Sequence, residues 1–282
     1  MKLKNKLTLL KTALSSEYDL SEANEICYRL IEQYVGFTKV QSMLQGEFKI
    51  TSQQLKHIDF AVKKLKEGIP LQHVFGYANF YGLEFKVTPN TLIPRPETEE
   101  LIELILHQNP NSKNMSVLDI GTGCGCIPIS LKTNRPQWSI SSMDISEKAL
   151  EIAKKNAKDH NTDITYIHDS ILKPTNFYPK YDLIISNPPY ILPSEKQNMT
   201  GQVLNHEPEI ALFIPENDPV LFYRHILDFS ITHLLDKGTI YFEINPLFKN
   251  LIVAYAQKLG FTKSKLIKDL NNKIRFIKIA KN

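Results

Sequence analysis

A short glycine-rich turn at residues 121–125 is the feature that most restricts how this chain can fold. The segment 117–120 has the apolar character of a buried strand and runs directly into Gly121-Thr-Gly-Cys-Gly125. The chain has only 11 glycines, and three of them lie within these five positions. Glycine lets the backbone approach a ligand where a Cβ would collide. Because a helix is expected after the turn, the pattern predicts a strand–turn–helix unit that binds a ligand at the carboxyl end of the strand.

The segments that follow this turn alternate between strand and helix patterns. We predict strands at 116–120, 139–143, 164–168, 182–186, 239–243, 261–267 and 274–279, and helices at 98–107, 127–132, 146–159, 221–235 and 247–259. Strands that alternate with helices are typical of βαβ units, in which the strands run parallel. The sequence therefore predicts an α/β domain with a doubly wound, seven-stranded, mostly parallel sheet.

The first 73 residues have a purely helical pattern. Apolar residues recur at helical spacing between Ala23 and Val35, with Ser21 as the expected cap and Gly36 as the end, and further helices begin after Thr38 and at Ser52. Residues 74–90 are aromatic and alternating, which favours a β-hairpin. We therefore expect three parts: a helical bundle over 1–73 that docks the substrate, a hairpin linker over 74–90, and the main domain over 91–282.

Charge and cysteine content restrict the setting and the partners. The net charge is +4, and +3 of it lies in residues 1–73, so the main domain is nearly neutral. An enzyme that binds duplex nucleic acid needs a basic face, so we expect no nucleic-acid partner. Three cysteines are too few for a disulfide framework. No apolar run approaches the 18 or so residues that cross a membrane. We therefore expect a monomeric cytoplasmic protein, with Met1–Lys11 starting a helix and not forming a secretion signal.

Three carboxylates at predicted strand ends indicate the class of ligand. Asp119 stands two positions before the first glycine, where it would repel a pyrophosphate but can accept hydrogen bonds from an ammonium group. Asp144 ends the second strand, 25 positions later, where a carboxylate can accept both hydroxyls of a ribose. Asp169 ends the third strand, within reach of an adenine amino group. A nucleoside that carries an amino acid fits all three, which predicts S-adenosylmethionine as cofactor and S-adenosylhomocysteine as product. The alternative is a tight turn with aspartates that only cap helices.

The fourth predicted strand runs into Asn187-Pro188-Pro189-Tyr190. Two consecutive prolines remove two backbone donors, so this loop presents acceptors. The Asn187 side-chain oxygen and the Pro188 carbonyl can each accept one N–H of a planar NH2 group and aim its nitrogen at a methyl carbon. We expect the Tyr190 ring to pack against the substrate and exclude water. The four residues are our candidate catalytic loop; the alternative is an ordinary proline-rich connection.

Together, these motifs resemble the release-factor glutamine methyltransferases, which methylate the glutamine of the Gly-Gly-Gln motif in peptide chain release factors. The resemblance covers nearly the whole chain and rests on Pro70–Gly76, Thr91–Glu99, the turn at 119–125, the loop at 187–190 and His206–Leu212. It implies a Rossmann-like class I methyltransferase domain, a release factor as substrate, and transfer to the glutamine N5 that modulates translation termination. It also implies cofactor contacts by Gly121, Thr122, Gly123, Cys124, Gly125, Asp144 and Asn187, and glutamine binding by residues 187–190.

Two departures from the family pattern are visible. Glu243-Ile-Asn245-Pro246 stands where the family commonly has Glu-x-Gly, which puts the local loop shape in question. Ser170 follows Asp169 where relatives often carry a larger residue, so we expect Ser170 to contact the cofactor while the adenine is stacked in another way. Cys124 and Cys126 form a lone C-x-C without further ligands, so we assign no metal.

Two other functions stay open at this stage. An adenine-N6 nucleic-acid methyltransferase handles the same NH2 geometry and could use the same loop, although the neutral main domain and the absence of an insert to read bases argue against it. A non-catalytic module that binds a nucleoside or a ribosomal partner is the other. It predicts that Asn187→Ala leaves function intact.

Overall fold

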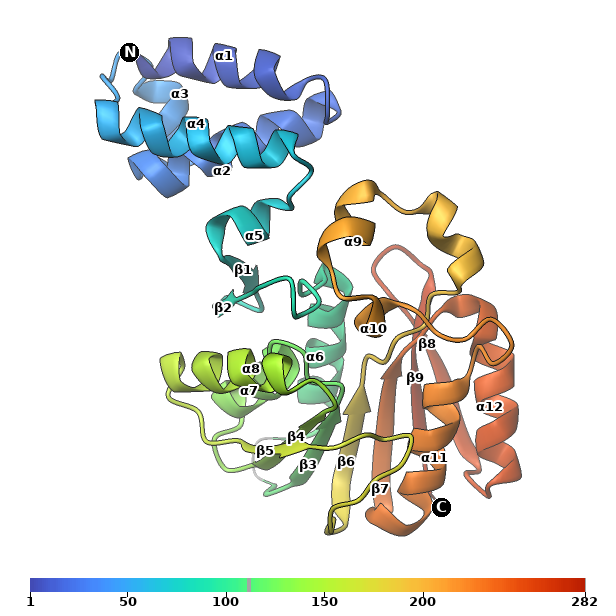
Figure 1. Ribbon diagram of the computed structural model, residues 1–282. Helices are drawn as coiled ribbons and strands as arrows, with labels where there is room; N and C mark the ends of the chain where they lie inside the picture. Colours follow the sequence, from blue (N-terminus) through green and yellow to red (C-terminus); the bar gives the residue numbers. More distant parts are fainter. Residues whose placement is uncertain (111–112, 282) are drawn as a thin grey trace. The chain divides into compact units, whose positions relative to one another are not determined.

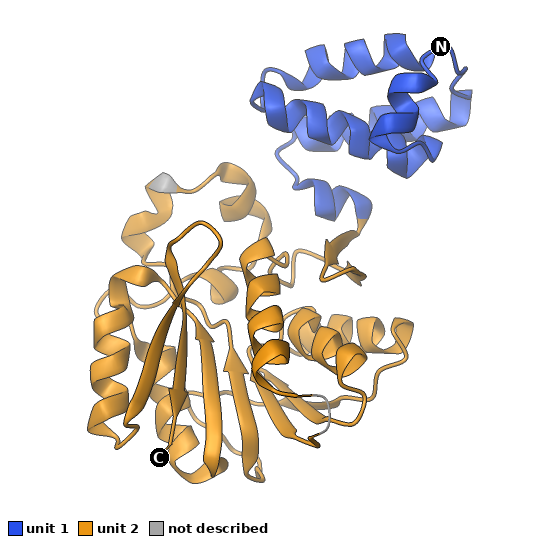
Figure 2. Ribbon diagram, turned by 180° about the vertical axis from the view of Figure 1, so that it is seen from behind, with its two compact units in different colours: residues 1–75 blue, residues 76–282 orange. Residues whose placement is uncertain are grey.

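The computed structural model describes residues 1–110 and 113–281. The chain divides into two compact units, Met1–Phe75 and Gly76–Asn282 (Figure 2). Each unit buries apolar side chains of its own, so each has a separate hydrophobic core. Within the described residues, no helix is long and apolar enough to cross a membrane.

Unit 1 is built from short helices that pack around one core. The helices are α1 (Leu3–Leu14), α2 (Leu20–Val35), α3 (Lys39–Leu44), α4 (Ser52–Lys66) and α5 (Leu71–Phe75). The predicted cap of α2 at Ser21 is wrong, because Asp19 accepts the Glu22 N–H at 2.9 Å and Ser21 lies in the first turn. Thr38 does cap α3: its hydroxyl accepts the Gln41 N–H, and the Gln41 side-chain oxygen accepts the Thr38 N–H in return. Helix α5 was not predicted, because five residues are too few to show a helical period.

Unit 2 begins with a small antiparallel hairpin of β1 (Tyr77–Phe80) and β2 (Leu83–Lys86). Asn156 fixes this hairpin to the rest of the unit, since its side chain accepts the Lys86 N–H at 2.9 Å and donates to the Lys86 carbonyl at 3.0 Å. The hairpin thus packs beside helix α8 (Glu147–Asp159).

The second sheet of unit 2 contains seven strands within the described part of the chain. They are β3 (Ser116–Ile120), β4 (Ser139–Asp144), β5 (Thr165–His168), β6 (Tyr181–Ser186), β7 (Leu234–Glu243), β8 (Lys263–Lys268) and β9 (Ile274–Ala280). Their order is β5-β4-β3-β6-β7-β9-β8, and only β9 runs antiparallel to both of its neighbours (Figure 1). The predicted seven-stranded, mostly parallel sheet is confirmed.

Helices cover both faces of this sheet (Figure 1). One face packs against α6 (Pro96–Gln108), α7 (Cys126–Asn134) and α8, and the other against α11 (Leu221–His233) and α12 (Lys249–Lys258). Side chains alternate across a strand, so Val117 belongs to the first core and Leu118 to the second. Because β3 is covered on both faces, Val117, Leu118 and Ile120 are all apolar and buried, which is why the sequence pattern indicated a strand here.

Short helices complete the connections around the sheet. The 3-10 helices are η1 (Pro193–Asn198) and η2 (Pro246–Phe248), and the α-helical turns are α9 (Gly201–His206) and α10 (Glu209–Leu212). The segments η1, α9 and α10 were not predicted, and η2 includes the first two residues of the helix predicted at 247–259, whose α-helical part begins at Lys249. Helix α11 also ends two residues before the predicted 235, because Leu234 already pairs with Tyr181 of β6.

The topology puts the carboxyl ends of β3, β4, β5 and β6 at one edge of the sheet. These strands run parallel, and β3 has β4 on one side and β6 on the other. The chain therefore leaves β3 and β6 toward opposite halves of the sheet, and ligands of open α/β sheets bind at such a point.

Candidate active site

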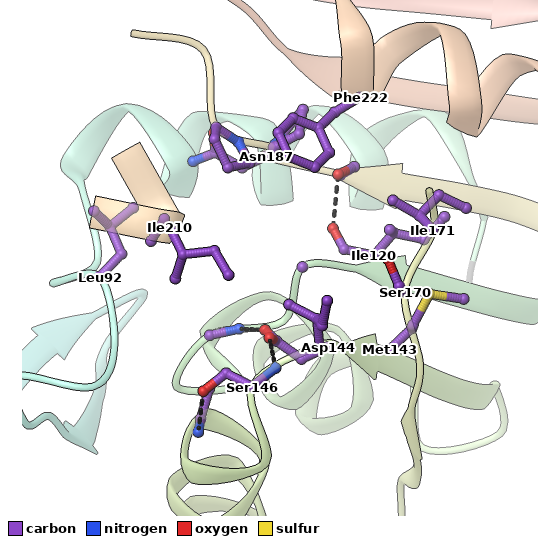
Figure 3. A pocket seen from close by; sticks show the side chains of 18 of the residues that line it. Leu92, Ile120, Met143, Asp144, Ser146, Ser170, Ile171, Asn187, Ile210 and Phe222 are labelled. Atoms are coloured by element: carbon purple, nitrogen blue, oxygen red, sulfur yellow. Dashed lines mark hydrogen bonds between the residues drawn. The ribbon is translucent and has the colours of Figure 1, made fainter. Parts of the chain in front are cut away.

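A cavity of about 250 Å³ opens at this edge of the sheet (Figure 3). Predicted site residues from four strand ends line it, namely Gly121, Gly123, Asp144, Asp169, Ser170, Asn187, Pro188 and Pro189. Its remaining wall is mostly apolar and includes Leu92, Met143, Ile145, Ile210 and Phe222. The sequence had thus singled out most of the polar part of the cavity and little of the apolar part.

The three glycines of the turn all have left-handed backbone conformations. Their φ angles are +79° at Gly121, +56° at Gly123 and +84° at Gly125. A Cβ at Gly121 or Gly123 would meet no atom within 4 Å, and both residues line the cavity, so their backbone is open to a ligand. A Cβ at Gly125 would lie 3.0 Å from Ile129 Cδ1 and 3.1 Å from Ala153 Cβ. Gly125 therefore serves the packing of α7 against α8.

Thr122 and Cys124 lie in the turn but do not line the cavity. Thr122 is buried and donates its hydroxyl to Ser142 Oγ at 3.3 Å. The Cys124 carbonyl accepts from Asn156 Nδ2 at 2.8 Å. The Thr122 side chain and the Cys124 backbone carbonyl thus hold the turn in place. Among the described residues, no group of three or more His, Cys, Asp or Glu side chains is placed to hold a metal ion.

Asp144 lies in the cavity wall at the end of β4. One carboxylate oxygen accepts the Gly123 N–H and the other the Ser146 N–H, both at 2.9 Å (Figure 3). Burial raises the pKa of Asp144, and these backbone donors oppose the rise. Each oxygen keeps a lone pair for a further donor. The residue therefore fits a pair of neighbouring hydroxyls, as in a ribose.

Asp119 is a fully buried carboxylate under the glycine turn. Neither of its oxygens has a hydrogen-bond partner within the described residues, and the side chain does not line the cavity. Burial raises the pKa of Asp119 to about 7, although the nearby Thr122 side chain offsets part of the rise. An unpaired buried acid is unfavourable unless a cation or donor compensates it. The residue thus fits a cofactor that brings an ammonium group, and that contact stays a prediction.

Asp169 has a different role from the predicted one. Its carboxylate accepts hydrogen bonds from Ser170, Thr175, Asn176 and Tyr178, at 2.7–3.2 Å. These six bonds exceed the roughly four lone pairs of a carboxylate, so no acceptor is left for an adenine amino group. They also hold the pKa of Asp169 well below its usual range in spite of desolvation. Asp169 shapes the loop after β5, and Ser170, Ile171 and Leu172 of that loop line the cavity.

Asn187 is linked to a buried glutamate at the end of β7. Asn187 Nδ2 donates to Thr98 Oγ1 at 3.3 Å, and Thr98 Oγ1 donates to Glu243 Oε2 at 2.7 Å. The other oxygen of Glu243 accepts the Tyr190 hydroxyl at 3.2 Å. Burial raises the pKa of Glu243, while the Thr98 and Tyr190 donors and nearby Arg275 lower it.

Tyr190 therefore does not take the predicted place against a substrate. It does not line the cavity, and its ring packs against the core on the α11 and α12 face of the sheet. Desolvation raises the pKa of Tyr190 well above its usual range, so the hydroxyl stays protonated and donates to Glu243. Tyr190 anchors the end of the loop whose Asn187, Pro188 and Pro189 line the cavity.

The sequence did not predict two of the contacts near the cavity, that between Thr98 and Glu243 and that between Arg95 and Glu207. Thr98 and Glu243 belong to segments that stood out as motifs, but nothing in the sequence pairs residues 145 positions apart. Glu207 is buried, accepts the Arg95 guanidinium at 2.6 Å and accepts the Ile93 N–H at 2.9 Å. This contact joins the 91–99 and 206–212 motifs, which supply Leu92 and Ile210 to the cavity wall (Figure 3).

Comparisons with known proteins agree with this geometry. Residues 98–212 match the methyltransferase small domain family, and residues 7–76 match the PrmC N-terminal domain family. The chain is similar to two proteins named release factor glutamine methyltransferase. The one from Flavobacterium psychrophilum is 40% identical over 282 residues, 99% of each chain. The one from Bacteroides thetaiotaomicron is 34% identical over 275 residues, 97% of this chain and 98% of the relative.

Solved structures with the same fold are more distant. A methyltransferase from Pyrococcus furiosus matches 81% of this chain and 98% of its own, with a TM-score of 0.51 and 16% identity. The Thermus thermophilus 16S rRNA N2 G1207 methyltransferase RsmC, solved with AdoMet and guanosine, matches 73% of this chain and 50% of its own, with a TM-score of 0.52 and 14% identity. At such identities these likenesses concern the fold alone. From its near full-length relatives, the chain belongs to the release factor glutamine methyltransferase family and is an S-adenosylmethionine-dependent methyltransferase.

Proposed function

We propose that this protein transfers a methyl group from S-adenosylmethionine to the side-chain amide nitrogen N5 of the glutamine in the Gly-Gly-Gln motif of peptide chain release factors, and so modulates translation termination. The observation that carries the proposal is that Asn187, Pro188 and Pro189 share one cavity with the glycine turn and Asp144. Relatives that bear the name of this activity are 34–42% identical to the chain.

The cofactor half of the proposed site consists of residues from β3 and β4. Asp144 would accept the two ribose hydroxyls, and the buried Asp119 carboxylate would face the ammonium end. The open backbone at Gly121 and Gly123 would let the ligand approach closely. Bound there, the cofactor supplies a methyl group on a positively charged sulfur, which is an electrophile that needs no metal.

The acceptor half of the proposed site is the loop after β6. An amide nitrogen is a poor nucleophile because its lone pair is delocalised. The Asn187 side-chain oxygen and the Pro188 carbonyl would each accept one N–H of the glutamine, hold the nitrogen in line and favour the positive charge that develops on it. Since prolines lack an N–H, the backbone at Pro188 and Pro189 presents no donor that would face the N–H groups of the glutamine. After transfer, the nitrogen releases its extra proton to solvent.

Residues 1–73 carry a net charge of +3, and we assign them to docking the body of the release factor, with the hairpin at 74–90 as linker and 91–282 as the methyltransferase domain. We expect a monomer that acts in the cytoplasm, where release factors work.

Mass spectrometry of a full-length release factor tests the proposal. The protein is incubated with release factor and S-adenosylmethionine, and we expect one added methyl group on the Gly-Gly-Gln glutamine. A release factor with that glutamine replaced by alanine should stay unmodified. Duplex DNA is offered in a parallel reaction. Methylated adenine without methylated release factor would overturn the proposal in favour of the adenine-N6 alternative, and cofactor binding without transfer to any substrate would favour a non-catalytic module.

A further inference from the structure

The hydrogen-bond chain from Asn187 to Glu243 has a fixed direction. Thr98 stands between them, and its side chain is 2% exposed, so solvent does not compete for its bonds. A threonine hydroxyl has a single proton. Thr98 gives that proton to Glu243 Oε2 at 2.7 Å, which is the shorter of the two bonds made by its hydroxyl. Toward Asn187, Thr98 Oγ1 can therefore act only as an acceptor.

The direction of this chain decides which way the Asn187 amide points. Asn187 donates Nδ2 to Thr98 Oγ1 at 3.3 Å, so its oxygen lies on the other arm of the planar amide. The flipped amide would place Oδ1 against a Thr98 lone pair and would offer an NH2 group to the NH2 group of a glutamine. Two donors facing each other cannot bond. Only one of the two amide orientations can accept an N–H from the methyl acceptor.

We propose that Glu243 and Thr98 are positioning residues that set the orientation of the Asn187 amide, so that its oxygen faces the methyl acceptor. The inference rests on the proposed function, because it assumes an acceptor that donates N–H to Asn187. Glu243 acts through Thr98 and touches neither substrate nor cofactor.

Glu243 is held firmly enough for this role. It is 1% exposed, its second carboxylate oxygen accepts the Tyr190 hydroxyl, and its backbone carbonyl accepts the Tyr223 hydroxyl at 3.1 Å. The guanidinium of Arg275 favours the charged carboxylate, which opposes the effects of burial and of Glu97. One carboxylate thus fixes both the first and the last residue of the 187–190 loop.

A residue near the end of β7 contacts the same loop. Asn245 donates Nδ2 to the Tyr190 carbonyl at 3.3 Å. Its own oxygen accepts the Leu247 N–H at 3.1 Å. This chain therefore adds a second bond between the end of β7 and the catalytic loop, and Glu243 keeps its place.

Paired variants of Thr98 test the inference. Thr98→Val removes the hydroxyl and keeps the shape, so we expect kcat for release-factor methylation to fall about 100-fold, in the range seen for a lost polar group at a reacting atom. Thr98→Ser restores the hydroxyl and should keep kcat within about threefold. The Kd for the cofactor should change little in both. Thr162→Val is the matched control, because Thr162 only donates to the Ala157 carbonyl outside the cavity.

A double-mutant cycle tests whether Glu243 acts through Thr98. We expect Glu243→Gln to lower kcat at least threefold more in the wild-type background than in the Thr98→Val background. In Thr98→Val there is no hydroxyl at position 98 for Glu243 to orient. Glu103→Gln is the control, since Glu103 also accepts a tyrosine hydroxyl, that of Tyr81, on an exposed surface. Equal effects of Glu243→Gln in both backgrounds would overturn the inference.

An NMR measurement separates this inference from the proposed function. Protein labelled with 15N-asparagine is recorded without release factor, and the Asn187 NH2 signals are assigned by their loss in Asn187→Ala. We expect these signals to shift in Thr98→Val and to stay in Thr98→Ser and Thr162→Val. Unshifted signals in Thr98→Val would overturn the relay whatever the substrate. A wild-type protein that fails to methylate release factor while the shift occurs would overturn the proposed function alone.

Discussion

At the scale of single residues, the site contains a buried acid, Asp119, that lowers the free energy of unfolding of the protein without cofactor. The two oxygens of Asp119 have no partner within the described residues, and burial raises the pKa of Asp119 to about 7. A carboxyl whose folded-state pKa lies above its unfolded value holds its proton more tightly in the folded protein. Its contribution to the free energy of unfolding is therefore greatest below about pH 4 and is lost as the pH rises to about 7.

The variant Asp119→Asn should separate stability from cofactor binding. Without cofactor at pH 8, we expect its free energy of unfolding in urea to exceed that of the wild type by on the order of 1–3 kcal/mol, and the difference to shrink toward pH 4. Calorimetry should show cofactor affinity at least tenfold lower, because the ammonium group loses its counter-charge. Asp163→Asn, at an exposed position, should change neither quantity. A destabilised Asp119→Asn protein at pH 8 would contradict this account.

Asn187 should matter for transfer far more than for cofactor binding. We expect Asn187→Ala to lower kcat for release-factor methylation by about 100-fold or more, because in the proposed function the lost oxygen would accept an N–H of the nucleophile. The cofactor Kd, measured by calorimetry, should stay within about tenfold. An equal loss in kcat and in cofactor affinity would mean that Asn187 serves mainly the cofactor.

At the scale of elements, the glycine turn fixes how closely α7 approaches α8. Gly125→Ala and Gly260→Ala place the same side chain at similar φ angles, +84° and +88°, but only the Cβ at 125 meets neighbours. Both variants should lose about 1–2 kcal/mol from the left-handed conformation. We expect Gly125→Ala to lose a further 1–3 kcal/mol or so from overpacking against Ile129 and Ala153. Urea unfolding measures the free energy of unfolding of both variants. Equal losses would show that α7 and α8 move apart to accommodate the Cβ without a loss of stability.

The ion pair between Arg95 and Glu207 joins two cavity walls, and hydrogen exchange can follow it. The Ile93 N–H donates to Glu207 Oε2, so Glu207→Ala should speed amide exchange at Ile93 at least tenfold. Glu209→Ala, two residues away, removes an exposed partner of Lys196 and should leave Ile93 unchanged. Unchanged exchange at Ile93 in Glu207→Ala would show that the segment is held by other contacts.

The sequence predicted the elements that have a clear period and missed those that do not. All seven strands of the large sheet were expected. The central strands β3 and β6 are buried on both faces and are mostly apolar, whereas the more polar β4 and β5 followed from the alternation of strand and helix patterns. Helices α5, α9 and α10 have four to six residues, too few to repeat a helical spacing.

Within the site, residue types were easier to predict than their partners. The wall positions of Asp144 and Asn187 followed from strand ends, since parallel strands end at one edge. Asp169 and Tyr190 were assigned to ligands, but folding gives them nearer partners, the loop donors at 170–178 and Glu243 respectively. A sequence does not show which of several possible donors reaches a carboxylate first.

At the scale of the whole molecule, the two units have separate cores, which supports testing them apart. We expect a chain of residues 76–282 to bind cofactor as the full chain does, since every residue that lines the cavity lies in unit 2. Its kcat/KM for full-length release factor should fall at least tenfold if residues 1–75 dock that protein. Activity on a short Gly-Gly-Gln peptide is the control and should not change. Equal activity on full-length release factor would refute the docking role.

The order of the strands separates two groups of cavity residues. On one side of β3, the ends of β4 and β5 supply Asp144 and Ser170; on the other, the end of β6 supplies Asn187 and the two prolines. In the proposed function, the residues that would hold the methyl donor and those that would hold the methyl acceptor therefore come from different stretches of chain. A change confined to the loop after β6 would therefore leave the residues that β4 and β5 contribute to the cavity in place. The strand order would thus allow the loop after β6 to change, and with it the methylation target, separately from the strands proposed to bind the cofactor.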